Sequence, residues 1–102
     1  PLFRSIPSSP QLIIRESALY YSLTEEDLRG QNRSKNTAIA RQIAMYLIRT
    51  LTNLSLKEIG AEFGDRNHST VISSIKKIED MIKTDPTMAA TVRDITSNIN
   101  SN

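Results

Sequence analysis

The residues best suited to specific chemistry stand together at positions 66 to 70, directly after a glycine turn. A helix capped by Asn67 would carry polar side chains on its first turn, from Asn67 through His68 and Ser69 to Thr70. Such side chains can exchange hydrogen bonds, or make methyl contacts, with the base edges of a nucleic acid. The backbone amides of the same turn direct the positive end of the helix dipole toward phosphate. This combination favours recognition over catalysis.

An enzyme is a second functional class to consider, because His68, Ser69 and Asp65 have the residue types of a hydrolytic triad. Three residues within one tight turn and helix start do not give a nucleophile, a base and an orienting group their required geometry. The acids at 25–27 are explained as partners of a helix dipole. A Gly-rich loop ending in Lys-Ser/Thr is absent, so ATP binding is not expected here. We expect no catalytic residue, metal site or cofactor in this chain.

The elements that must position these side chains are two helices joined by a turn. Ser55 to Glu58 form a capping box that opens a helix expected to end at Gly64, and Asn67 opens the next. Gly60 allows close approach of the two helices, and Gly64 can adopt the left-handed backbone of a tight turn. Four apolar residues are expected to face the core: Ile59, Phe63, Val71 and Ile75. The segment predicts a helix-turn-helix, which places its second helix in the major groove of DNA.

Four further helices are predicted around this unit. The first starts at Ser9 and Pro10 and runs to Tyr21, and its expected apolar side is Leu12, Ile13, Leu19 and Tyr20. A short helix begins at Thr24 and stops at Gly30. A long amphipathic core helix covers 36–51, the helix after Asn67 runs to about 83, and the last begins at Pro86. No segment alternates apolar and polar residues, so the fold class is all-α, a compact bundle of about six helices.

The charge of this 102-residue chain is unevenly distributed. Eight basic and three acidic side chains lie from Arg33 to Lys77, a net +5 against +2 for the whole chain. A positive centre suits a surface that neutralises phosphates, although a solvated charged face has the same composition. There is no cysteine, so disulfides and thiolate metal sites are excluded, and the cytoplasm is the expected location. No run of about 18 apolar residues indicates a transmembrane span.

Three segments together resemble a known family. They are Phe63 to Val71, Leu56 to Gly60 and Ala40 to Leu47, and they resemble the C-terminal DNA-binding domain (domain IV) of the DnaA family of bacterial replication initiators. The resemblance extends from about Ile13 to Ile82. It implies a TrpR-like helix-turn-helix and binding of double-stranded DNA at DnaA boxes. These are short A·T-rich elements of consensus TTATNCACA in replication origins and some promoters.

The resemblance also implies contact residues. Base contacts fall on Arg66, Asn67, His68, Ser69 and Thr70 in the major groove and on Arg33 in the minor groove. Backbone contacts fall on Lys35, Arg41, Gln42, Arg49, Ser55, Leu56, Lys57 and Lys77. Arg41, Gln42 and Arg49 are expected to lie away from the apolar stripe of their helix, free to meet a partner. The family usually has Asp at position 67 and Thr at 69. An amide donates as well as accepts hydrogen bonds, which leaves the base preference open.

The domain organisation expected from the sequence is a linker remnant at 1–9, a DNA-binding domain at 10–100 and a frayed tail at 101–102. Three prolines and three serines among the first ten residues indicate a fragment of a larger protein. In the family, ATP and Mg²⁺ binding and self-assembly on DNA would belong to the full-length protein, and the fragment alone is expected to be monomeric. The alternative function is a helical module for protein or acidic-phospholipid binding, with the basic helix from Lys35 to Arg49 on anionic lipid.

Overall fold

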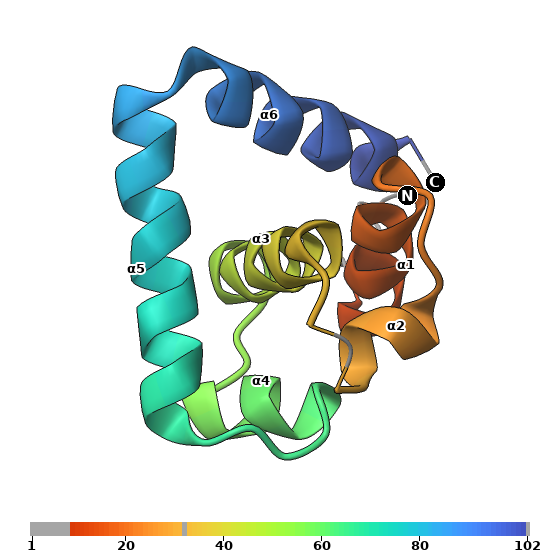
Figure 1. Ribbon diagram of the computed structural model, residues 1–102, viewed down its shortest axis with the longest axis vertical. Helices are drawn as coiled ribbons and strands as arrows, with labels where there is room; N and C mark the ends of the chain where they lie inside the picture. Colours follow the sequence, from red (N-terminus) through yellow and green to blue (C-terminus); the bar gives the residue numbers. More distant parts are fainter. Residues whose placement is uncertain (1–8, 32, 102) are drawn as a thin grey trace, which may run out of the picture.

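The computed structural model describes residues 9–31 and 33–101, which form six α-helices (Figure 1). In chain order they are α1 (Pro10–Tyr20), α2 (Glu25–Arg29), α3 (Lys35–Leu51), α4 (Leu56–Glu62), α5 (His68–Thr84) and α6 (Pro86–Asn100). No strand occurs in these two ranges, and the prediction of an all-α bundle is confirmed. The expected linker remnant lies outside the described residues except for Ser9, and so does the last residue of the expected tail.

Each helix begins at a side chain that caps it. Ser9, Thr24, Ser34, Ser55, Asn67 and Asp85 each accept a hydrogen bond from a backbone N–H of the first turn. Thr24 with Asp27 and Ser55 with Glu58 form complete capping boxes, as predicted. These caps satisfy amides that have no partner inside a helix, so the helix starts follow from local sequence.

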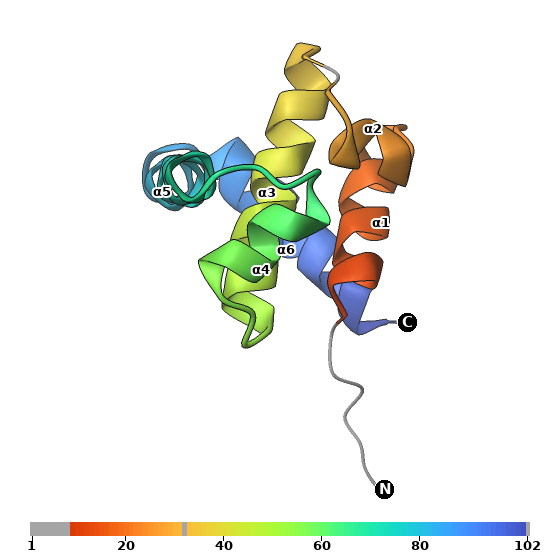
Figure 2. The same cartoon turned by 90° about the horizontal axis from the view of Figure 1, so that it is seen from below.

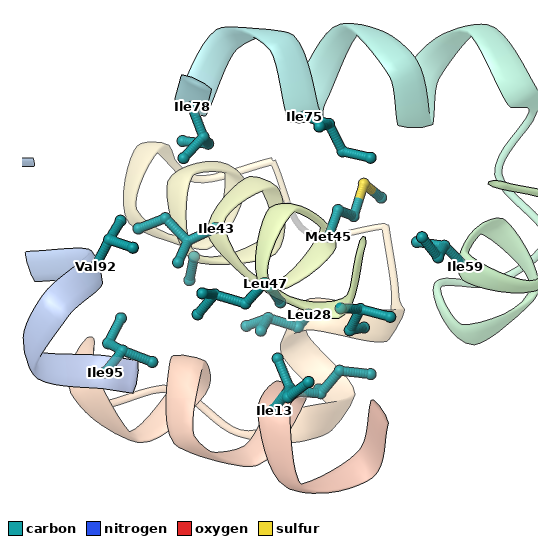
Figure 3. Packing of buried hydrophobic residues seen from close by; sticks show 14 of the residues in the cluster. Ile13, Leu28, Ile43, Met45, Leu47, Ile59, Ile75, Ile78, Val92 and Ile95 are labelled. Atoms are coloured by element: carbon teal, nitrogen blue, oxygen red, sulfur yellow. The ribbon is translucent and has the colours of Figure 1, made fainter. Parts of the chain in front are cut away.

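Helix α3 is the centre of the molecule, with α5, α6, α1 and α4 arranged around it in Figure 1. Its buried apolar residues are Ala40, Ile43, Ala44, Met45, Leu47 and Ile48. They meet side chains of the surrounding helices in one core, including Ile13, Ile59, Ile75 and Ile95 (Figure 3). The prediction of a long amphipathic core helix is confirmed, and Ile39 and Leu51 at the edges of its apolar side are only half-buried.

The apolar side predicted for α1 was partly wrong. Ile13, Ile14 and Ala18 are buried, whereas Leu19 is 59% and Tyr20 is 42% exposed. Four-residue spacing aligns Ile14 with Ala18, and Leu19 lies one step around the helix from this buried side. The hydroxyl of Tyr20 donates instead to the Asp94 carboxylate on α6, at 3.3 Å.

Helix α4 ends at Glu62, two residues earlier than predicted. None of the described helices is long and apolar enough to cross a membrane.

Candidate nucleic-acid interface

The turn between α4 and α5 has the geometry predicted from its glycines. A Cβ atom added to Gly60 would overlap the carbonyl oxygen of Arg66, at less than the 3.0 Å that real Cβ atoms keep. Gly64 has a φ of +74°, which is left-handed backbone that costs glycine little. The amide of Arg66 donates to the Gly60 carbonyl at 3.0 Å. The turn therefore holds the beginning of α5 directly against α4.

Burial fixes the direction of α5 on this turn. Ile59 from α4 and Phe63 directly after this helix are fully buried with Val71 from α5, and Ile75 is buried one turn later, as predicted. Asn67, His68, Ser69 and Thr70 are all exposed. Figure 2 looks nearly along α5 and shows how this helix stands at the side of the bundle. The packing leaves the first turn of α5 open to a partner.

The side chain of Asn67 has a defined orientation. Its Oδ1 accepts a hydrogen bond from the Thr70 amide at 2.9 Å. Because the NH₂ group of an asparagine side chain cannot accept a hydrogen bond, this bond fixes which end of the amide group faces the helix. The NH₂ group of Asn67 has no acceptor among the described residues and points away from the cap. Asn67 therefore presents a hydrogen-bond donor to the outside.

Two grooves flank the first turn of α5. One has a volume of about 360 Å³ and is lined by Lys57, Ala61, Asp65, Arg66, Asn67 and His68. The other has a volume of about 390 Å³ and is lined by Gln42, Asn67, Ser69, Thr70, Ser73, Ser74 and Lys77. The structure thus brings predicted contact residues of α3, α4 and α5 together on both sides of the turn. Ser73 and Ser74 line the second groove but were not among the predicted contact residues. Ser73 is exposed four residues after Ser69, a spacing that the sequence shows, whereas Ser74 is buried.

Most of the predicted backbone contacts are accessible. Lys35, Arg49, Lys57 and Lys77 are exposed, as is Arg33 in the loop between α2 and α3. Gln42 is half-buried, and its Oε1 has no hydrogen-bond partner among the residues that the structure describes. Ser55 and Leu56 form the start of α4, where the first backbone amides of a helix have no partner inside it. The Glu58 carboxylate accepts from the Ser55 amide at 2.8 Å, and this hydrogen bond lowers the pKa of Glu58.

Arg41 does not lie where the sequence suggested. Only 9% of this residue is exposed, and the expectation of a side chain free to meet DNA is wrong. Its Nε donates to the carbonyl of Leu28 at 2.7 Å, and its Nη2 donates to those of Asp27 at 3.1 Å and Gly30 at 3.2 Å. The last carbonyls of a helix lack partners within it, and Arg41 supplies donors to α2. Burial, followed by the charge of Arg66, lowers the pKa of Arg41.

Arg66 also differs from the expectation. Its side chain is half-buried, and its Nη2 donates to the same Gly30 carbonyl that Arg41 contacts. The guanidinium group is thus turned toward α2 and away from the exposed first turn of α5. Sequence reasoning could not detect this contact, because Gly30 and Arg66 are separated by 36 positions.

Comparisons with known proteins agree with this geometry. The family model described as "Bacterial dnaA protein helix-turn-helix" matches residues 10–78. The chain is 48% identical over 94 residues to the chromosomal replication initiator protein DnaA of Clavibacter sepedonicus, and equally to that of Leifsonia xyli. It is 42% identical over 99 residues to the protein of the same name from Cutibacterium acnes. These matches cover 92% to 97% of the chain but 20% of each relative, so the chain spans about a fifth of their length.

Proposed function

The chain belongs to the bacterial DnaA helix-turn-helix family, and from this premise we propose that it binds double-stranded DNA with sequence specificity. The proposed targets are DnaA boxes in a replication origin and in some promoters. In this role the chain is the origin-recognition module of a replication initiator in the bacterial cytoplasm.

One observation carries the proposal. The first turn of α5 is polar and exposed, whereas the side of the helix that follows it toward the core is buried. His68 and Ser69 project from a helix whose angle is fixed by Val71 and Ile75 in the core. A recognition helix held in this way can place its first turn against the base edges of the major groove. The flanking grooves bring Lys57 and Lys77 to either side, where they would meet the phosphates of the two strands.

The proposed contacts follow from these positions. Asn67, His68, Ser69 and Thr70 read bases in the major groove, and Arg33 enters the minor groove. The phosphate contacts are Lys35, Gln42, Arg49, Lys57, Lys77 and the start of α4 at Ser55 and Leu56. Arg41 and Arg66 are not among these contacts, because their guanidinium groups donate to the carbonyls of Leu28 in α2 and of Gly30 directly after it. Phosphate contacts make the affinity dependent on salt, and the base contacts supply the preference for a sequence.

Other roles belong to the rest of the longer relatives. Binding of ATP and Mg²⁺ and self-assembly on DNA are proposed for the full-length protein, since this chain corresponds to a fifth of such a protein. Binding to acidic phospholipid through α3 is a weaker candidate. The apolar residues of α3 are buried in the core, so this helix has no apolar face to lay on a membrane without unfolding the bundle.

The test is a comparison of wild type with His68→Ala on a duplex containing TTATCCACA and on a scrambled duplex. We expect His68→Ala to remove the preference for the box while leaving weak, salt-dependent binding to both duplexes. Lys83→Ala is the matched control, because Lys83 is exposed at the far end of α5. An unchanged ratio of the two affinities in His68→Ala would show that the first turn of α5 does not read the DNA.

A further inference from the structure

The positive centre of the chain contains three acidic side chains, and the fold uses two of them internally. Glu58 accepts a hydrogen bond from the Ser55 amide at 2.8 Å, and Glu62 forms an ion pair with Arg29 at 3.0 Å. Asp65 is exposed, and its carboxylate has neither a hydrogen bond nor an ion pair with any described residue. The contacts that hold the fold therefore do not account for the carboxylate of Asp65.

The backbone at this position does not account for an aspartate either. Asp65 has a φ of +58°, directly after Gly64 at +74°. Left-handed backbone is costly for a residue with a Cβ atom, although aspartate and asparagine tolerate it better than most. Asp65 does not cap α5, because Asn67 occupies that place. A carboxylate without an internal partner thus stands at a turn where glycine would be easier to accommodate.

The groove that Asp65 lines is part of the proposed DNA interface. Lys57, a proposed phosphate contact, lines the same groove from α4, and so do Asn67 and His68, two proposed base contacts. In a helix-turn-helix the first helix crosses the DNA backbone, and α4 is the first helix here. A phosphate held by Lys57 in this groove would therefore lie close to the Asp65 carboxylate, and both of these groups are negatively charged.

We propose that Asp65 limits the affinity of the chain for DNA by repelling the phosphate that Lys57 attracts. This inference rests on the proposed function, because it requires DNA to cross α4. Like charges that face each other across an interface oppose binding, and a charge at the rim acts mainly on the association rate and on the salt dependence. Since phosphate contacts carry no sequence information, the repulsion should weaken binding to box and scrambled DNA alike.

The substitution Asp65→Asn isolates the charge. Asparagine has nearly the same shape and also tolerates left-handed backbone, so the variant should fold with a melting temperature close to that of wild type. Glu79→Gln is the matched control, because it removes one exposed negative charge from the second half of α5, about 16 Å along the helix from His68. This separation exceeds the distance of about 8 Å over which exposed charges act at physiological salt.

The first measurement is fluorescence anisotropy on the TTATCCACA duplex and on a scrambled duplex at several salt concentrations. At near-physiological salt we expect Asp65→Asn to tighten binding to both duplexes about fivefold, and Glu79→Gln to tighten it by less than about twofold. The logarithm of the affinity should also fall more steeply with the logarithm of the salt concentration. The slope should change by at most about 0.9, the value for one additional phosphate contact.

The second measurement locates the phosphate. Neutral methylphosphonate groups replace the phosphates of the box duplex one at a time. Lys57→Ala should lose its binding penalty at the phosphate that Lys57 contacts, because the replaced group no longer carries a charge. At this same phosphate the gain from Asp65→Asn should fall below about twofold, since no repulsion is left to remove.

Other outcomes would overturn the inference. A full gain from Asp65→Asn at the neutralised phosphate would show that Asp65 does not face it. A gain no larger than that of Glu79→Gln would reflect net charge alone, and a loss confined to one base pair of the box would identify Asp65 as a base contact. Failure of the proposed function would be seen separately, as equal affinity of wild type for the two duplexes, because the gain expected for Asp65→Asn does not depend on sequence.

Discussion

Replacing Gly60 with alanine adds one methyl group at the closest approach of α4 to the turn. The new Cβ would overlap the Arg66 carbonyl oxygen and would lie about 3.5 Å from the Val71 side chain. The overlapping group is backbone, and its residue also donates its amide back to the Gly60 carbonyl at 3.0 Å. The turn cannot move aside without loosening this hydrogen bond.

Two effects of opposite sign decide the outcome. Alanine favours a helix interior by about 1 kcal/mol over glycine. Overpacking against a fixed neighbour costs about 1 to 3 kcal/mol, and the upper end applies here because no flexible side chain can yield. We therefore expect a net loss of about 2 kcal/mol in the free energy of unfolding, which lowers the melting temperature by roughly 10 °C for a domain of this size.

Thermal and urea unfolding measure the loss of stability, and anisotropy on box and scrambled duplexes measures the second consequence. Because the clash pushes the turn away from α4, the first turn of α5 should shift and the preference for the box should fall. Ala61→Gly is the control. Ala61 is exposed on the same helix, so this substitution changes helix propensity without creating a clash. If Gly60→Ala were as stable as wild type and kept its preference, the close approach at Gly60 would not set the position of α5.

Three further predictions concern single side chains. Arg41→Ala should lower the free energy of unfolding by about 3 kcal/mol in urea titrations, because α2 loses a buried charged donor, while the folded protein keeps its box-to-scramble ratio. Asn67→Asp should keep the cap but replace the outward hydrogen-bond donor with an acceptor. In binding measurements on boxes varied one base pair at a time, the preference at the contacted position should shift by about 1 to 3 kcal/mol toward a base that presents a donor, such as cytosine. The Ser55 amide stabilises the Glu58 carboxylate and holds the pKa of Glu58 below its ordinary value of 4.5. The contribution of this hydrogen bond to the free energy of unfolding is therefore present above pH 4.5 and is lost as the pH falls through the lowered pKa. Glu58→Gln should therefore differ more from wild type in melting temperature at pH 6 than at pH 3.

Local signals in the sequence were sufficient for most of the fold. Most helix starts could be predicted because a capping side chain acts within three residues of its amide. The exception is α3, which was predicted to begin at 36 and begins at Lys35, after a cap at Ser34 that was not identified. The core of α6 was readable too, since Met88, Val92, Ile95 and Ile99 follow the helical period and are all buried. The turn glycines were interpreted correctly because their roles depend on backbone geometry at one position.

The two errors in the candidate site concern arginines whose partners are distant in the sequence. Arg41 lies off the apolar stripe, and nothing in its neighbourhood shows that α2 would place three carbonyl groups beside it. Arg66 stands among polar residues that face outward, yet its side chain reaches back to Gly30. A charged side chain can serve DNA or a helix end equally well, and only the packing of α2 against α3 and the turn distinguishes the two uses.

The most direct test of the account is fluorescence anisotropy of the wild-type chain with a duplex carrying TTATCCACA and with a scrambled duplex of equal composition, at near-physiological salt. We expect the chain to bind the box at least about tenfold more tightly than the scrambled duplex, a difference of about 1.4 kcal/mol. Equal affinity for the two duplexes would contradict it.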